Sequence, residues 1–131
     1  MTVVVDTNVL IELFFPTQNG DVVQRLWDAD RDWRLPQLWV CEFCHVHLKY
    51  LRAGHLDLST ALNNLALAEE AFLPLTVSIE SAGALQLAHS HGCSSYDAEF
   101  VLLAQLLACP LLTFDRKLLQ LFPDVAVKPG S

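Results

Sequence analysis

Short apolar runs alternate along the chain with longer segments in which apolar residues recur at helical spacing. The run TVVVD at positions 2–6 is β-branched and uninterrupted, which is typical of a strand buried on both faces of a parallel sheet. Similar runs predict four more short strands, the last of them at an edge of the sheet. These four are WRLP (33–36), LPLTV (73–77), the LLT of LLTFD (111–113), and VAVKP (125–129).

The segments between these runs predict helices with recognisable ends. An apolar segment, VLIELFF, stops at Pro16. Gly54 and Gly92 are expected just after the last turns of two helices, because glycine tolerates the left-handed conformation there. Ser59 is expected to cap another helix. The predicted helices span residues 21–30, about fifteen residues ending at Ala53, and residues 60–72, 78–92, 96–108 (capped by Ser94 or Ser95) and 116–122.

Strands that alternate with helices predict an α/β fold. We expect a single domain over residues 1–131, with a central, mostly parallel sheet of four to five short strands and helices on both faces. Hydrophobic residues make up 53% of the chain and charged residues only 18%. This apolar surplus predicts a dense core, an oligomer interface, or both.

Composition and cysteine use also bear on the location of the protein. Every apolar run is broken by a polar residue or proline well before the ~18 residues that a membrane span needs. The opening MTVVVDTN has neither a basic segment nor a signal cleavage site, so we expect a cytoplasmic protein with no membrane partner. The four cysteines, at positions 41, 44, 93 and 109, do not suit a disulfide scaffold and would stay reduced in that compartment.

The formal net charge of −7 argues against a protein that binds nucleic acid through phosphate contacts alone, because such proteins are usually basic. Any phosphate chemistry here would need bound divalent cations, or a local basic stripe whose field differs from that of the whole molecule.

Four acidic residues from distant segments are expected at one edge of the sheet. Asp6 ends the first strand, and Asp115 lies just past LLT. Glu42 and Asp97 fall in the first turns of predicted helices. Because the crevice of an α/β sheet lies at the carboxyl ends of its strands, this acidic quartet should converge there.

Each acid of the quartet taken alone has an ordinary explanation, as a helix cap or as a charge that favours a helix N-terminus. Together, four carboxylates in one crevice would repel and raise one another's pKa unless a cation neutralised them. Carboxylate oxygens suit Mg²⁺ or Mn²⁺ better than zinc, and such a site can activate water and stabilise the charge of a phosphoryl displacement.

Three stretches resemble the successive motifs of PIN-domain ribonucleases, most closely those of VapC-type toxins from bacterial toxin–antitoxin pairs. They are VVVDTNVLIELF, WVCEFCHVHLKYLRAG and SSYDAEFVLLAQLLACPLLTFDRKL. The resemblance covers nearly the full chain and is most specific in the third stretch. It implies a PIN-like fold and an RNA-cleaving enzyme that uses Mg²⁺ or Mn²⁺ and leaves a 5′-phosphate and a 3′-hydroxyl. It also implies a homodimer and a small antitoxin protein that occludes the crevice.

Matched position by position, the family's catalytic and metal-binding acids fall on the acidic quartet. Asp6 and Asp97 are expected to be essential, and Asp115 less critical, because it would act through water or on a second, weaker ion. Thr113 matches the hydroxyl residue before the fourth acid, and Asn8 follows the first acid. Both are expected to orient water or carboxylates.

A few basic and imidazole side chains lie near the quartet in sequence. His45, Lys49 and Arg52 follow Glu42 at three, seven and ten positions, so they fall on the same side of the predicted helix as Glu42. Two further cations directly follow Asp115. All are candidate RNA contacts, and single-stranded or loop RNA is the expected target type. They are His45, Lys49, Arg52, Arg116 and Lys117.

Two alternatives stay open at this stage. One is a PIN-like interaction module whose acids are structural and whose apolar surface serves only assembly. The other is a zinc-stabilised domain, in which Cys41 would co-ligate with Cys44 or His45, and HSHGC (89–93) could add a histidine or cysteine ligand. Structural zinc usually holds its C-x-x-C on a tight turn, whereas this one lies in a strong helical pattern. His47 is expected to be a packed histidine rather than a ligand.

Overall fold

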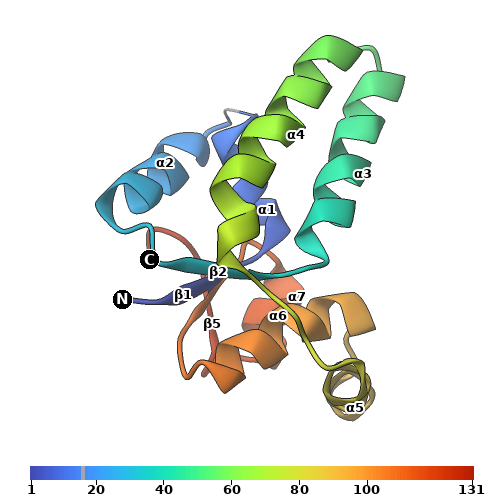
Figure 1. Ribbon diagram of the computed structural model, residues 1–131. Helices are drawn as coiled ribbons and strands as arrows, with labels where there is room; N and C mark the ends of the chain where they lie inside the picture. The colour runs from blue at the N-terminus through green and yellow to red at the C-terminus, as the bar shows by residue number, and fades with distance from the viewer. Residues whose placement is uncertain (16) are drawn as a thin grey trace.

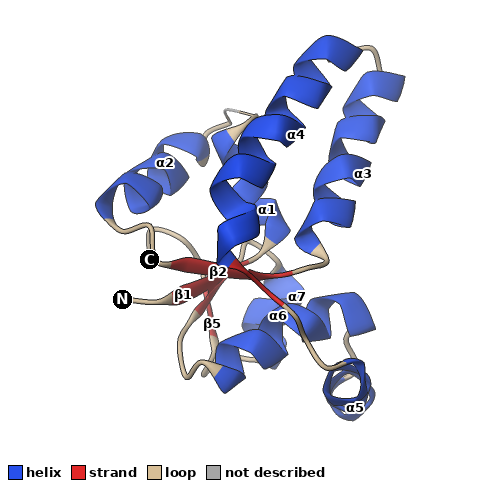
Figure 2. Cartoon of the chain, in the orientation of Figure 1, coloured by secondary structure: helices blue, strands red, loops and turns tan. Residues whose placement is uncertain are grey.

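In the part of the chain that the structure describes, five short strands form one central sheet, and all four neighbouring pairs run parallel. The computed structural model describes residues 1–15 and 17–131, so the predicted break at Pro16 lies outside the described residues. The order across the sheet is β3-β2-β1-β4-β5 (Figure 2). The strands are β1 Val3–Val5, β2 Trp33–Pro36, β3 Thr76–Val77, β4 Leu111–Leu112 and β5 Ala126–Val127.

The central strand is β1, whose Val4 pairs with Arg34 of β2 on one side and with Leu111 of β4 on the other. Val4 and Val5 are fully buried, which confirms the prediction of a strand covered on both faces. The LPLTV run is only partly a strand. Its first three residues form a 3-10 helix, η2 Leu73–Leu75, because Pro74 cannot donate a ladder hydrogen bond.

Helices cover both faces of the sheet, as predicted (Figure 1). Of the described helices, four lie on one face together with a 3-10 turn, and α3 and α4 form a projecting antiparallel pair there. The other three described α-helices lie on the opposite face. The first group comprises α1 Thr7–Leu10, η1 Ile11–Leu13, α2 Gly20–Ala29, α3 Trp39–Arg52 and α4 Leu58–Phe72, and the second comprises α5 Ser81–His91, α6 Ser95–Leu106 and α7 Arg116–Leu121. None of the described helices combines the length and apolarity needed to cross a membrane.

Each face has its own apolar core. The first is rich in rings: Trp39, Phe43 and Phe72 are almost fully buried and pack edge to face. The second is largely aliphatic and joins Leu103 of α6 to Leu118 of α7 across β4. Because the sheet is anchored on both faces, the carboxyl ends of its strands form a rigid edge.

The helix ends follow the local chemistry of the chain. Gly54 and Gly92 adopt positive φ angles of 76° and 73° just after α3 and at the end of α5, as predicted. Ser94 caps α6. The prediction that Ser59 caps α4 is wrong, because that helix begins at Leu58 and the carboxylate of Asp57 accepts the backbone N–H of Thr60 at 2.7 Å.

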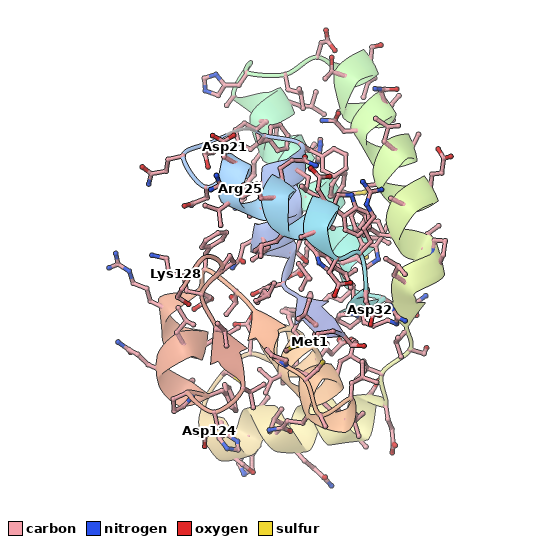
Figure 3. The ribbon with its side chains drawn as sticks, turned by 90° about the vertical axis from the view of Figure 1, so that its left-hand side faces the viewer. Met1, Asp21, Arg25, Asp32, Asp124 and Lys128 are labelled. Atoms are coloured by element: carbon pink, nitrogen blue, oxygen red, sulfur yellow. The ribbon has the colours of Figure 1, made fainter. Side chains whose placement is uncertain are left out.

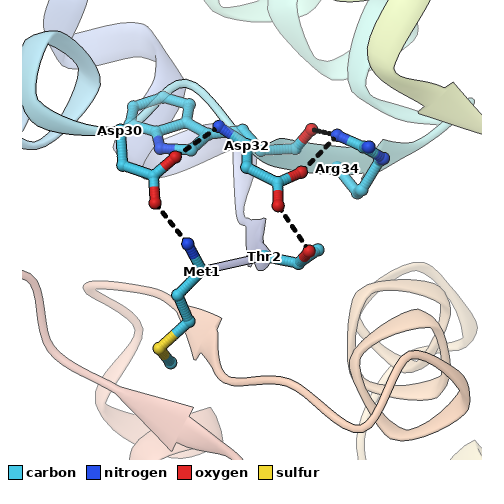
Figure 4. A network of polar contacts seen from close by, with 6 residues as sticks. Met1, Thr2, Asp30, Asp32 and Arg34 are labelled. Carbon is cyan, nitrogen blue, oxygen red and sulfur yellow. Dashed lines mark hydrogen bonds and ion pairs between the residues drawn. The ribbon is translucent and has the colours of Figure 1, made fainter.

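At the amino ends of β1 and β2, acidic side chains are paired. The amino group of Met1 contacts the carboxylate of Asp30, the Thr2 hydroxyl donates to Asp32 at 2.6 Å, and Arg34 reaches Asp32 at 2.9 Å (Figure 4). Met1 and Asp32 lie side by side on the face shown in Figure 3. Exposed pairs of this kind add little to the stability of the fold, because solvent screens them.

The cap of α4 gives a test of the fold. Asp57→Ala is expected to lower the free energy of unfolding by about 1 kcal/mol, because the first turn loses its acceptor. Ser59→Ala is the matched control and should change it by less than about 0.5 kcal/mol. Urea unfolding followed by circular dichroism measures both. Equal losses in the two variants, or a loss only in Ser59→Ala, would contradict this assignment.

Candidate active site

Asp6 lies at the junction of β1 and α1, at the centre of the carboxyl edge of the sheet. It is only 6% exposed, and its Oδ2 accepts a 2.8 Å hydrogen bond from the Thr113 hydroxyl just after β4. Its extended backbone (φ −70°, ψ 151°) places it at the N-cap of α1, yet its side chain makes no capping hydrogen bond. The carboxylate of Asp6 is therefore not used as a helix cap.

Thr113 organises this edge. It is fully buried, and besides donating to Asp6 its oxygen accepts the backbone N–H of Asp115 at 3.0 Å and the side-chain amide of Asn8 at 3.4 Å. The Asn8 oxygen accepts the backbone N–H of Phe114 at 3.2 Å. These bonds connect the segments that follow β1 and β4.

The other three acids approach from helix N-termini. Glu42 lies in the first turn of α3, and its Oε1 accepts the Thr7 hydroxyl at 2.7 Å. Asp97 is half-buried in the first turn of α6. Asp115 caps α7, and its Oδ1 accepts the backbone N–H groups of Lys117 at 2.8 Å and Leu118 at 3.2 Å. The capping role of Asp115 expected from the sequence is thus present.

One pocket of about 290 Å³ brings the whole quartet together. Its acidic lining comes from four segments that are distant in the sequence. Two polar and two apolar side chains complete it. The lining residues are Asp6, Thr7, Asn8, Ile11, Glu42, Val46, Asp97 and Asp115.

Three carboxylates in this pocket, those of Asp6, Glu42 and Asp97, hold protons more tightly than usual. Burial, with the negative charges of Glu42 and Asp97, raises the pKa of Asp6 to about 7, although the Thr113 hydrogen bond opposes the rise. Burial is also the main cause that raises the pKa values of Glu42 and Asp97. Asp115 adds to the rise for Asp97, whereas the charge of Lys117 counteracts it. The pocket thus carries excess negative charge that a bound cation would relieve.

The residues suit a hard divalent cation by their chemistry, because the ligands on offer are carboxylate oxygens. In the described part of the chain, no three His, Cys, Asp or Glu side chains already stand in an arrangement that would hold a metal ion. The quartet is therefore an open pocket lining rather than a finished ligand cage.

Two contributors were absent from the sequence prediction. Thr7 directly follows Asp6 in DTN, and this adjacency is the one feature of the sequence that points to a role in the site. Its hydrogen bond to Glu42 joins residues 35 positions apart, which no local pattern reveals. Glu99 lies two positions after Asp97, and its charge raises the pKa of Glu42. No local pattern separates Glu99 from an ordinary helix-surface acid.

The candidate RNA contacts are only partly grouped around the pocket. Lys117 is electrostatically coupled to Asp97, and His45 lines a second pocket that also includes Glu42. Lys49 lines a third pocket, farther along α3. The remaining two, Arg52 and Arg116, are exposed and form no ion pair with any described residue.

The cysteine and histidine side chains of α3 do not gather at one site. Cys41 lines the same pocket as His45, whereas Cys44 lines an apolar groove between α3 and α4. His47 is buried, with Nδ1 donating to the Phe43 carbonyl at 2.8 Å and Nε2 accepting from the Asn64 amide at 3.2 Å. Both of its nitrogens are occupied, so His47 is a packed histidine, and the two thiols face different pockets. This geometry gives no support to a zinc site on α3.

The raised pKa of Asp6 has a consequence for stability. Below pH 3.8, the pKa of Asp6 in the unfolded chain, the carboxyl group is protonated in both the folded and the unfolded state. Above this pH the unfolded chain ionises first, so the free energy of unfolding falls as the pH rises to about 7. Without metal, Asp6→Asn should remove this part of the fall and raise the free energy of unfolding at pH 8 by about 1–3 kcal/mol. Urea unfolding from pH 4.5 to 8 measures it. Asp21→Asn, an exposed control (Figure 3), should keep the wild-type slope, and an equally steep slope in Asp6→Asn would refute the explanation.

The chain is similar to known proteins over most of its length. The PIN domain family model matches residues 3–126. Ribonuclease VapC3 of Pyrobaculum aerophilum is 31% identical over 126 residues, which are 94% of this chain and 96% of the relative.

Two solved structures share the fold. A Pyrobaculum aerophilum crystal structure has a TM-score of 0.77 at 22% identity and covers 96% of this chain and 83% of its own. A toxin–antitoxin complex from Klebsiella pneumoniae has a TM-score of 0.68 at 17% identity and covers 97% of both chains. By its sequence and its fold, this chain belongs to the PIN-domain family.

Proposed function

We propose that this protein is a Mg²⁺- or Mn²⁺-dependent endoribonuclease that hydrolyses RNA phosphodiester bonds and serves as the toxin of a type II toxin–antitoxin pair. The carrying observation is the convergence of four carboxylates from four distant segments on one pocket. The relative named Ribonuclease VapC3 supports RNA as the substrate. The catalytic unit is a single PIN-like domain spanning residues 1–131.

Asp6, Glu42, Asp97 and Asp115 would hold the divalent ion, directly or through water. When bound, the ion would lower the pKa of a coordinated water and stabilise negative charge on the phosphate. Thr113 and Thr7 each engage one carboxylate oxygen, of Asp6 and Glu42 respectively, and so fix the direction of the other. Asn8 acts through Thr113. These three residues are positioning residues.

Asp6 and Asp97 would be the essential acids. Asp6 lies deepest in the pocket, and Asp97 is the acid whose pKa responds both to Asp115 and to Lys117. Asp115 contributes less, because one of its oxygens already caps α7 through two backbone N–H groups.

The proposed function also implies an RNA substrate and protein partners. With a net charge of −7, the protein would bind RNA weakly through phosphates, with Lys117 nearest the acidic pocket and Lys49, Arg52 and Arg116 along the approach. Single-stranded or loop RNA fits this weak general affinity. A small antitoxin, a homodimer and a cytoplasmic location complete the proposal. The antitoxin is supported by the fold shared with a toxin–antitoxin complex.

RNA cleavage tests the proposal directly. Purified protein should cleave single-stranded RNA with Mn²⁺ or Mg²⁺ and stop when EDTA is added. Asp6→Asn and Asp97→Asn should each reduce the rate at least ~100-fold, and Asp115→Asn less, because the ion loses a ligand or its orientation. Gel analysis of end-labelled RNA measures the rates. Glu70→Gln, an exposed acid of α4, is the control and should cleave like the wild type. Cleavage that persists in both Asp6→Asn and Asp97→Asn would contradict the proposal.

Ion binding can be measured without any substrate. Mn²⁺ should raise the melting temperature of the wild-type protein in a concentration-dependent way, because the ion binds the folded state. Asp6→Asn should show a smaller rise or none, although its melting temperature without metal should be higher than that of the wild type at pH 8. Differential scanning calorimetry gives both values, with Glu70→Gln again as control. The same Mn²⁺-induced rise in Asp6→Asn as in the wild type would exclude Asp6 as a ligand.

A further inference from the structure

A second pocket opens beside the acidic one. It has a volume of about 480 Å³, within the range of roughly 300–1,000 Å³ that is usual for small-ligand sites. Most of its wall is apolar, and its polar groups are a carboxylate, an imidazole, a thiol and a phenol. It is lined by Leu38, Cys41, Glu42, His45, Val46 and Tyr96, and we call it the Tyr96 pocket.

The two pockets adjoin each other along α3. Glu42 and Val46 line both of them. On the opposite wall, Tyr96 directly precedes Asp97 in the first turn of α6, so an aromatic ring and a carboxylate of the quartet are neighbours in the chain. A ligand that places a phosphate at the acidic pocket would therefore extend its next group into the Tyr96 pocket.

Tyr96 is unusual among the aromatic residues. Its side chain is 62% exposed, and within residues 1–15 and 17–131 it stacks on no other ring. Tyr50, the other tyrosine, already stacks on Phe15 with ring centres 4.5 Å apart. Tyr96 thus presents a free ring face at a site lined by apolar side chains.

The chemistry of the pocket selects the part of an RNA that fits it. The lining contains Glu42 and neither lysine nor arginine, so a phosphate would be repelled. A neutral, flat nucleobase can stack on Tyr96 and offer its edge to the imidazole of His45. Such contacts would also give an acidic protein affinity for RNA that does not depend on phosphate charge.

We propose that the Tyr96 pocket holds an unpaired nucleobase next to the phosphate at the acidic pocket, with Tyr96 stacking on the base and His45 hydrogen-bonding to its edge. This inference rests on the proposed function for the identity of the ligand. It makes Tyr96 the residue that holds the base and His45 the residue that selects among the four bases. Stacking tolerates all four bases, whereas a hydrogen bond to the base edge discriminates among them.

The test measures binding separately from cleavage. Fluorescence anisotropy of a labelled single-stranded RNA hexanucleotide is recorded with the full-length protein in EDTA, and repeated with an abasic ribose at each position in turn. In the wild type, the abasic group should weaken binding about 10-fold at one position, as expected from ~1.4 kcal/mol of stacking. Tyr96→Ala should weaken binding of the intact RNA by a similar factor and lose the further effect of the abasic group. Tyr96→Phe should bind like the wild type.

Leu106→Ala is the matched control, because Leu106 lies on the same helix, is 67% exposed and lines neither pocket. It should bind every RNA as the wild type does. His45→Ala should flatten the preference among the four bases at the sensitive position. The base pocket is refuted if Tyr96→Ala binds like the wild type, if its loss is the same with the abasic RNA, or if the wild type binds none of the oligonucleotides.

Cleavage of the same RNA with Mn²⁺ separates the two proposals. If the wild type cleaves but Tyr96→Ala binds and cleaves identically, the nuclease stands and the base pocket falls. If the binding effects of Tyr96 and the abasic group are coupled but no cleavage occurs under any condition, the base pocket stands and the hydrolytic function falls.

Discussion

The hydrogen bond from the buried Thr113 hydroxyl to the Asp6 carboxylate is the interaction on which the candidate active site depends. It joins the ends of β1 and β4 at the point where two apolar strands bring an acid into the interior. A buried carboxylate without a donor is costly, and the usual response is protonation. Here burial raises the pKa of Asp6 to about 7 even with the donor present. The site is thus held in a state that a divalent cation would stabilise.

Among the described residues, acidic side chains are paired at the amino ends of the strands and lack ion pairs at the carboxyl ends. At the amino ends, Asp30 and Asp32 face an amino group, a hydroxyl and Arg34. At the carboxyl ends, the quartet makes no ion pair with any cation of residues 1–15 and 17–131. A chain that needed acids only for surface solubility would gain nothing by gathering four around one pocket. Convergence on one pocket and the burial of Asp6, together with the absence of a paired cation in the described chain, distinguish these acids from those of a solvated surface.

The fold and the quartet could be predicted because both depend on local patterns and one topological rule. The β-branched run before Asp6 and the helix starts before Glu42 and Asp97 are visible in the sequence, and the rule that parallel strands end at one edge groups them. What the sequence did not reveal depends on side-chain contacts. Thr7 meets Glu42 across 35 positions, and Asp57 takes the cap expected of Ser59, because competing acceptors are decided by backbone geometry. The exposed ring of Tyr96 could not be predicted either, because the sequence does not show which side chains pack against it.

The central claim is that a divalent cation displaces protons from the buried carboxylates, and calorimetric titration with Mn²⁺ tests it most directly. Heats measured in buffers of different ionisation enthalpy give the number of protons released on binding. Because Asp6 titrates near pH 7, binding should release about one proton at pH 6 and almost none at pH 9. Binding without release at pH 6, or no binding at either pH, would contradict the account.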